Sequence, residues 1–143
     1  MAISGLVITY NEEKNIGKCI DALFEVCDEV IIVDSLSADN TVKIAEEKGA
    51  KVISQKFLGD GPQRTHGLPF CKNDWILNLD ADEFLDKDAK EFILKEKYLE
   101  GNYDAFSFRV KNFLADELID FSGWYPDHKV RFFNKKTAKP SEA

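Results

Sequence analysis

The sequence predicts an α/β fold, in which a mostly parallel β-sheet is flanked by helices and gains antiparallel strands in its C-terminal third. Up to residue 99, short runs rich in Val and Ile alternate with amphipathic segments, an order typical of a parallel sheet covered on both faces. After Gly101 apolar residues recur with a period of two, as in antiparallel strands. A length of 143 residues with 44% apolar content fits one domain, residues 1–143.

The first half of the chain predicts three strands and two helices. "ISGLVITY", "EVIIVD" and "KVIS" are short β-branched runs typical of buried strands, and the second ends at Asp34. We expect Asn11 to cap the first helix, and Gly49 to stop a second helix over 41–48. The first helix has one continuous apolar stripe, formed by Ile16, Cys19, Ile20, Leu23, Phe24 and Cys27.

The second half begins with a glycine-rich loop and a short helix in "FLGDGPQRTHGLPF", which Pro69 should end or kink. "DWILNLD" is the fourth strand, and Asp86 or Asp88 caps the next helix. "YDAFSFRVKNF" and "HKVRFFN" alternate as antiparallel strands, and 135–143 has no periodicity and is expected to be a loose tail. The apolar face of the last helix is expected to comprise Ala89, Phe92, Ile93 and Leu99.

Composition narrows the possible partners and compartment. A net charge of −7 argues against a general affinity for nucleic acid, which needs a basic surface. Cys19, Cys27 and Cys71 have neither C-x-x-C nor zinc-site spacing, so we expect buried free thiols in a reducing cytoplasm. No signal peptide and no apolar run of ~20 residues is present. Peripheral contact with a membrane stays open.

Polar residues follow three of the predicted strands. They are Thr9, Tyr10, Asn11 and Glu12 after the first, Asp34 and Ser35 after the second, and Asp80, Asp82 and Glu83 after the fourth. Ligands of open parallel sheets bind outside the carboxyl ends of the strands. A single aspartate there is more often a helix cap or a turn residue. Three polar strand ends on one rim favour a binding site.

Asp80 and Asp82 form a D-x-D motif of hard carboxylate oxygens, which suit Mg²⁺ or Mn²⁺. Such an ion typically takes one or two carboxylates plus substrate phosphates, so it would bridge the protein to a diphosphate. An EF-hand loop starting at Asp80 would need glycine where Leu85 stands, and neither a Walker A loop nor G-x-G-x-x-G is present. D-x-D by itself is a weak motif.

Four segments occur in one order: "VITYNEEKNI", "DEVIIVDSLSADNTVKIAEEKGAKV", "GPQRTHGLPFCKNDWILNLDADE" and "WYPDHKVRFF". Together they resemble the family 2 glycosyltransferases with a GT-A fold, in particular the branch related to bacterial lipopolysaccharide core glucosyltransferases. The resemblance implies metal-dependent, inverting transfer of a hexose, for which glucose is a guess. The implied donor is a nucleotide-diphosphate sugar, with a UDP-sugar favoured, and the implied acceptor is a glycan or a lipid-linked molecule. The implied location is the cytoplasm or the cytoplasmic face of the membrane.

The resemblance also implies roles for individual residues. Asp34 matches the acid that contacts the base, and Arg64 a basic position near the diphosphate, although Arg64 could be a solvated helix charge. Asp82 matches the metal ligand and Asp80 a position nearer the ribose. The first nucleotide-contacting segment matches Thr9, Tyr10, Asn11 and Glu12. The segment near the sugar and acceptor matches Trp124, Tyr125, Asp127 and Arg131, although the first two could pack in a core or lid.

The catalytic base is the least defined part of the resemblance. In the family an acidic base follows the "RFF" strand, and Glu142 is the only acid after that strand here, with Asp127 as a second candidate. Family members usually continue well past this point. Two alternatives therefore stay open: a nucleotide-sugar-binding domain or truncated fragment without efficient transfer, and an α/β domain whose strand-end acids are only caps.

Overall fold

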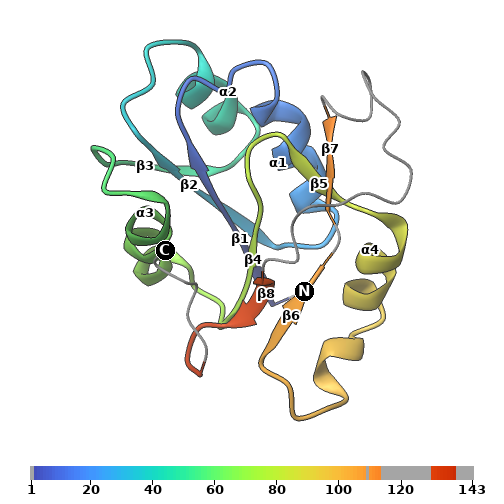
Figure 1. Cartoon of the computed structure of the whole chain (residues 1–143). Coiled ribbons are helices and arrows are strands. Elements are labelled where there is room, and N and C mark those ends of the chain that lie inside the picture. Colours follow the sequence, from blue (N-terminus) through green and yellow to red (C-terminus); the bar gives the residue numbers. More distant parts are fainter. Residues whose placement is uncertain (1, 109, 114–129, 138–143) are drawn as a thin grey trace.

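A computed structural model describes residues 2–108, 110–113 and 130–137 and contains the predicted elements in the predicted order (Figure 1). The first half comprises β1 (Ile3–Thr9), α1 (Ile16–Phe24), β2 (Glu29–Asp34), α2 (Thr41–Glu47) and β3 (Lys51–Ser54). The second half comprises α3 (Asp60–Gly67), the 3₁₀ turn η1 (Leu68–Phe70), β4 (Trp75–Asn78), β5 (Glu83–Leu85), α4 (Lys87–Leu94), the 3₁₀ turn η2 (Lys97–Leu99), β6 (Ala105–Ser107), β7 (Val110–Asn112) and β8 (Val130–Asn134).

The main sheet has the strand order β3-β2-β1-β4-β8-β6. The first four of these strands are parallel, whereas β8 runs antiparallel to both β4 and β6. A separate two-stranded antiparallel sheet pairs β5 with β7. The predicted α/β fold with antiparallel additions in the C-terminal third is therefore confirmed.

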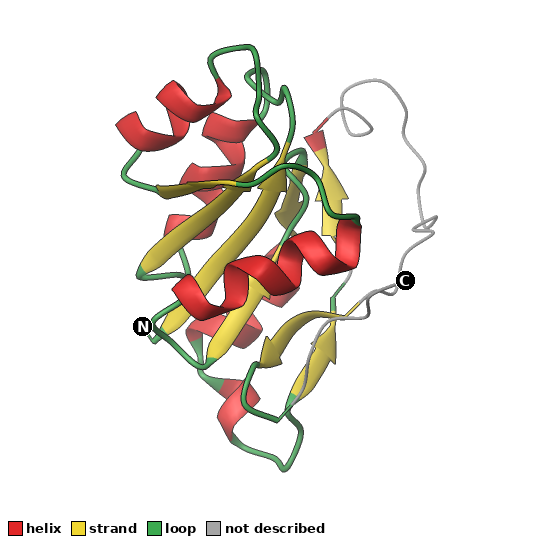
Figure 2. Cartoon of the chain, turned by 90° about the vertical axis from the view of Figure 1, so that its left-hand side faces the viewer, coloured by secondary structure: helices red, strands yellow, loops and turns green. Residues whose placement is uncertain are grey.

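Each face of the main sheet has its own apolar core. The smaller core places Leu6, Ile31, Val33 and Ile76 under α3 and η1. The larger core lies on the opposite face under α1, α2 and α4, and includes Ile20. Figures 1 and 2 show helices on both sides of the sheet. Alternating side chains of each central strand thus enter opposite cores, as expected for buried parallel strands.

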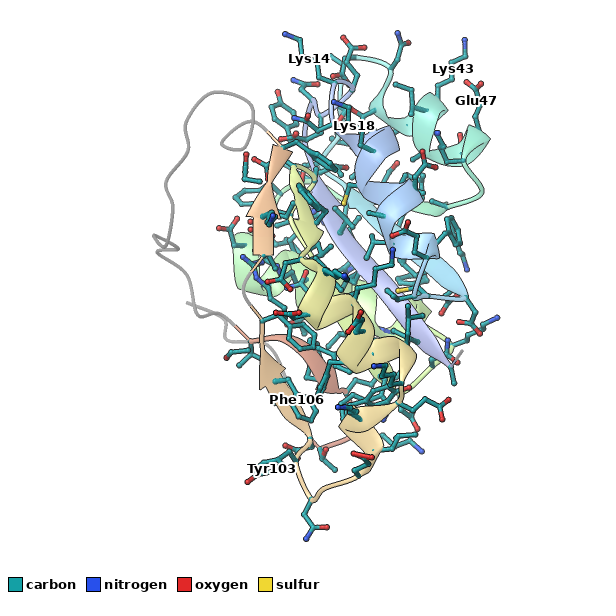
Figure 3. The ribbon with its side chains drawn as sticks, turned by 90° about the vertical axis from the view of Figure 1, so that its right-hand side faces the viewer. Lys14, Lys18, Lys43, Glu47, Tyr103 and Phe106 are labelled. Carbon is teal, nitrogen blue, oxygen red and sulfur yellow. The ribbon has the colours of Figure 1, made fainter. Side chains whose placement is uncertain are left out.

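Aromatic rings connect the C-terminal strands to the rest of the fold. The ring of Trp75 in β4 lies 5.0 Å from that of Tyr98 and 4.9 Å from that of Phe132 in β8, and Phe106 in β6 contacts the same group. This cluster is at the end of the molecule where Phe106 and Tyr103 lie, away from Lys14 and Lys43 (Figure 3). It anchors β8 against β4 despite the long separation of these strands in sequence.

Two local predictions were wrong, those for Asn11 and Leu99. Asn11 does not cap α1, which begins at Ile16; Asn11 instead has a positive φ of 52° and accepts a hydrogen bond from the Ala38 amide. Leu99 is 56% exposed because α4 ends at Leu94, and Tyr98 is buried in its place. The alternating segment over 103–113 forms two antiparallel strands, β6 in the main sheet and β7 in the small one, as expected for additions at or beside the sheet.

Other local expectations hold. Asp86 caps α4 by accepting a hydrogen bond from the Ala89 amide. Gly49 follows α2 with a positive φ of 91°, and all three cysteines are buried free thiols. Residues 135–137, the start of the predicted tail, form a turn, and the remainder of that tail lies outside the described residues. No helix within the described ranges has the length and apolar character needed to cross a membrane.

Candidate active site

The carboxyl ends of β1 and β2 are joined through Asp34. Thr9 and Asp34 are paired in the register of these strands, and Thr9 Oγ1 donates a 2.7 Å hydrogen bond to Asp34 Oδ1. Ser37 donates to the same carboxylate from its amide at 2.8 Å and from its hydroxyl at 2.6 Å. Asp34 is 1% exposed. These donors orient the predicted base-contacting carboxylate at the rim of the sheet.

The loops after β1 and β2 are bound to one another. The Asn11 amide donates to Ser37 Oγ at 2.8 Å, and the Glu12 amide donates to Thr41 Oγ1 at 2.8 Å. Tyr10 and Leu36 project from these loops and are 61% and 60% exposed. The predicted nucleotide-contacting segment, residues 9–12, is therefore ordered by its neighbours while the ring of Tyr10 faces solvent.

The D-x-D motif is a tight turn between β4 and β5. The Leu79 amide still pairs with the Leu6 carbonyl of β1, and the chain then turns so that the Glu83 amide donates to the Asp80 carbonyl at 3.0 Å. Ala81, the small residue between the two aspartates, is buried within the turn. On the outer side, Asn112 Nδ2 of β7 donates a 2.6 Å hydrogen bond to Asp82 Oδ2.

Two arginines converge on Asp80. Arg64 Nη2 from α3 lies 2.8 Å from Asp80 Oδ1, and its Nε donates to Asn78 Oδ1 at 3.3 Å. Arg131 Nη1 from β8 lies 4.0 Å from Asp80 Oδ2. The side chain of Arg64 is only 13% exposed, so this residue is not a solvated helix charge. The predicted contact of Arg131 with the sugar stays a prediction.

Negative charge accumulates at this rim despite the two arginines. Burial, with Asp82, Asp39 and Asp80 nearby, raises the pKa of Glu12. Burial and Asp80 also raise the pKa of Glu83 to about 7, against the opposing effect of Arg131. Burial is the larger cause of both shifts, and the neighbouring carboxylates of the D-x-D turn add to it. A bound cation would relieve the repulsion among these carboxylates.

The donor set fits a divalent ion that is shared with a substrate. Within the described residues, no group of three or more His, Cys, Asp or Glu side chains could hold a metal ion. Mg²⁺ and Mn²⁺ sites for nucleotides need only one or two carboxylates, because phosphate oxygens complete the coordination. Asp82, with Asp80 two residues before it, offers oxygens of this kind.

Sequence reasoning missed Gln63, a fully buried polar side chain of α3. Its Nε2 donates to Ser35 Oγ at 3.1 Å and to the Gln55 carbonyl at 2.9 Å, while its Oε1 accepts from the Leu58 amide at 2.9 Å. Gln63 thereby links the loop after β2 to the loop after β3. The available signal was its i, i+4 spacing to Gly67, which identifies the inward side of the helix.

The comparison with protein families decides the membership of this chain. The family described as glycosyl transferase family 2 matches residues 4–140. The chain belongs to glycosyl transferase family 2. Its mostly parallel sheet, flanking helices and antiparallel additions form the GT-A fold of this family.

Curated relatives of this family 2 chain include an uncharacterized glycosyltransferase of Rickettsia prowazekii, 43% identical over 92% of the chain and 42% of the relative. The lipopolysaccharide core biosynthesis glycosyltransferase LpsC of Rhizobium meliloti is 36% identical over 65% of the chain and 36% of LpsC. The chain thus spans less than half the length of these relatives.

Solved structures of similar fold include glucosyl-3-phosphoglycerate synthase of Mycobacterium tuberculosis in complex with Mn²⁺, UDP and glucosyl-3-phosphoglycerate. It is 25% identical, with a TM-score of 0.61 over 74% of this chain and 43% of the synthase. S. aureus TarS 1-349 in complex with UDP-GlcNAc is 27% identical, with a TM-score of 0.58 over 75% of this chain and 34% of TarS. These structures bind nucleotides or nucleotide sugars.

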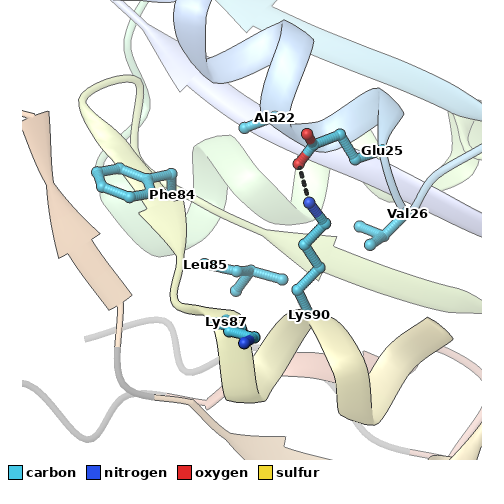
Figure 4. Close-up of a pocket in the computed structure, with 7 residues that line it drawn as sticks. All are labelled: Ala22, Glu25, Val26, Phe84, Leu85, Lys87 and Lys90. Atoms are coloured by element: carbon cyan, nitrogen blue, oxygen red, sulfur yellow. Dashed lines mark ion pairs between the residues drawn. The ribbon is translucent and has the colours of Figure 1, made fainter. Parts of the chain in front are cut away.

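The remaining predicted site residues of this family 2 chain, Trp124, Tyr125, Asp127 and Glu142, lie outside the described residues. Their roles stay predictions. A separate hollow is present between α1, β5 and α4 (Figure 4). It is lined by Ala22, Glu25, Val26, Phe84, Leu85, Lys87 and Lys90, and Lys90 forms a 2.9 Å ion pair with Glu25 there. It contains none of the predicted site residues.

Proposed function

We propose that this chain acts in an inverting, metal-dependent glycosyltransferase that transfers a hexose from a nucleotide-diphosphate sugar to a glycan or lipid-linked acceptor. The observation that carries the proposal is the D-x-D turn, where Asp80 is paired with Arg64 on the same rim as Asp34 and Glu12. Such a rim offers groups for a base, a diphosphate and a metal ion. The proposed acceptor belongs to lipopolysaccharide or a related glycan, and the proposed compartment is the cytoplasm.

Each group of the rim has a proposed task in binding. Asp34 accepts a hydrogen bond from the nucleotide base, and Tyr10 provides an exposed ring beside it. Asp82 holds Mg²⁺ or Mn²⁺, which when bound offsets charge on the leaving diphosphate. Arg64, held by Asp80, supplies a fixed positive charge to the same leaving group. Asp127 or Glu142 takes the proton of the acceptor hydroxyl.

Titration with UDP in the presence of MnCl₂ tests the donor and metal parts of this proposal. UDP with Mn²⁺ is expected to raise the melting temperature of the chain, and EDTA is expected to abolish the rise. Asp82→Asn should lose most of the shift, whereas Asp88→Asn, a change at an exposed carboxylate on α4, should retain it. A shift that survives EDTA and Asp82→Asn would contradict the proposed metal site.

Turnover of the donor separates the two functional alternatives. Hydrolysis of a UDP-sugar, or transfer from it to an acceptor, would support the transferase. Binding of UDP with Mn²⁺ without turnover would support the alternative of a nucleotide-sugar-binding domain. An unchanged melting temperature with every nucleoside diphosphate would refute both alternatives. The strand-end acids would then be helix caps and turn residues.

A further inference from the structure

A buried ion pair lies behind the D-x-D turn, and its two members come from distant parts of the chain. Glu83 is the first residue of β5 and Arg131 lies in β8, with Glu83 Oε2 at 2.8 Å from Arg131 Nη2. The side chain of Arg131 is 1% exposed and that of Glu83 is 10% exposed. Of the described groups, none accepts a hydrogen bond from Arg131 Nε.

Stability alone is a poor reason for such a pair. Removing a carboxylate and a guanidinium from water costs several kcal/mol per ion, and apolar replacements of similar volume are often neutral or stabilising. The positions of the two charges are therefore more informative than their mutual attraction. Both charges contact the residue that begins the D-x-D turn.

Glu83 holds the backbone of Asp80 at two points. Its Oε1 accepts a 2.8 Å hydrogen bond from the Asp80 amide, and its own amide donates to the Asp80 carbonyl at 3.0 Å. Arg131 Nη1 is 4.0 Å from Asp80 Oδ2, while Arg64 occupies the other oxygen, Oδ1, at 2.8 Å. The backbone and carboxylate of Asp80 are thus fixed from three directions.

The geometry points to Glu83 and Arg131 as positioning residues that hold the D-x-D turn in its metal- and diphosphate-binding form. This inference rests on the proposed function, because it assigns a role at the same site. Both side chains are almost fully buried and contact Asp80, so the role assigned to them is exerted through Asp80 and through the turn that presents Asp82. Loss of a group that orients a metal ligand in this way typically lowers metal affinity by 10–100-fold.

Calorimetric titration of Mn²⁺ and UDP into four variants of the chain tests the inference. Glu83→Gln and Arg131→Met are each expected to weaken Mn²⁺-dependent UDP binding about 10-fold or more. The double variant is expected to bind UDP with Mn²⁺ as tightly as the weaker-binding single variant, because all three variants disrupt the same ion pair. Arg131→Lys keeps the positive charge but loses the paired donors of the guanidinium group, so it should retain part of the affinity that Arg131→Met loses.

A substitution in the larger core, at Ile93 of α4, is the control for general destabilisation. Ile93→Val removes one methylene from a fully buried position and should lower the melting temperature without changing Mn²⁺ or UDP affinity. Thermal melts of every variant define a temperature at which all are folded, and the titrations are compared there.

Three results would overturn the positioning role. The first is an unchanged affinity of Glu83→Gln for UDP with Mn²⁺. The second is a loss of affinity in the double variant that equals the sum of the two single losses in free energy. The third is a loss of affinity in Ile93→Val as large as that in Glu83→Gln. If the unsubstituted chain itself binds no UDP with Mn²⁺, the proposed function fails and the role of the pair fails with it. Unchanged affinity in Glu83→Gln alone leaves the proposed function standing.

Discussion

At the residue scale, the carboxylate of Asp80 shows how a functional group is held before any ligand arrives. Arg64 binds one of its oxygens, and Glu83 binds its amide. Asp82 has a different surrounding, because its described side-chain partner is the neutral amide of Asn112. The two aspartates of one motif therefore differ in charge environment. This difference agrees with the proposal that Asp82 holds the metal ion while Asp80 holds Arg64.

Replacement of Arg64 tests the charge that is proposed to face the diphosphate. Arg64→Ala should weaken Mn²⁺-dependent UDP binding about 10–100-fold, because a hydrogen bond to a charged group contributes about 1.5–3 kcal/mol. Arg64→Lys should be intermediate, since lysine keeps the charge but cannot bind Asn78 and Asp80 together. Calorimetry measures both variants. Lys43→Ala, at an exposed site on α2, is the control, and an equal loss there would refute a specific role for Arg64.

The three cysteines should be unreactive in the native chain. Burial raises the pKa of Cys71 to about 12 and also raises the pKa of Cys19 and Cys27. A free thiol is half ionised near pH 8.5, but these thiols keep their protons there, and the thiolate is the reactive form. Labelling with a disulfide reagent at pH 8.5 should be fast only after unfolding in guanidinium chloride. Fast labelling of the folded chain would contradict the burial of these residues.

At the scale of elements, the site depends on contacts between segments that are far apart in sequence. β7 provides Asn112 and pairs with β5, whose first residue is Glu83. On the other side, α3 brings Arg64 to the end of β4 because the helix packs closely on β1 and β2. That close approach depends on Gly67, which faces Leu6 and Val33.

Gly67→Ala should therefore destabilise the fold. An added Cβ would lie 2.6 Å from Leu6 Cδ1 and 2.7 Å from Val33 Cγ2, so α3 would have to shift. Overpacking of this kind costs about 1–3 kcal/mol in the free energy of unfolding. Gly17→Ala on α1 is the matched control, because its Cβ would meet Ile44 and Lys48 at an ordinary 3.5 Å. Equal urea midpoints for the two variants would refute the tight packing of α3.

At the scale of the whole molecule, we expect the main sheet to be the most stable part of the fold and the small sheet the least stable. β1 lies between two parallel neighbours and is covered by cores on both faces. Within the described residues, β5 and β7 have three residues each and form a two-stranded sheet, which is marginal without further packing.

Amide hydrogen exchange should follow this difference in packing. Amides of β1 and β2 are expected to exchange only through global unfolding, whereas those of β5 and β7 exchange through local opening. Addition of UDP with Mn²⁺ should slow exchange in β5 and β7 most, because the D-x-D turn leads into β5. Equal protection of β1 and β7 without ligand would contradict the expected order.

The sequence by itself determined the order of the elements, because each strand and helix of the first hundred residues has its own hydrophobic period. It also located Asp34, Asp80 and Asp82, since strand ends are visible in a single segment and parallel strands share one rim. The exposed Leu99 and the sheet that each part of 103–113 joins were not predicted, because local periodicity does not say which sheet a short segment joins.

Only the tertiary structure decided which side chains meet behind the rim. Arg131 lies 48 positions from Glu83 along the chain, and β8 brings them together only by pairing with β4. Gln63 likewise appears as a polar helix residue until the loops that it joins are folded around it. Local sequence specifies elements through short-range periodicity, whereas contacts between distant charges exist only after the sheet has assembled.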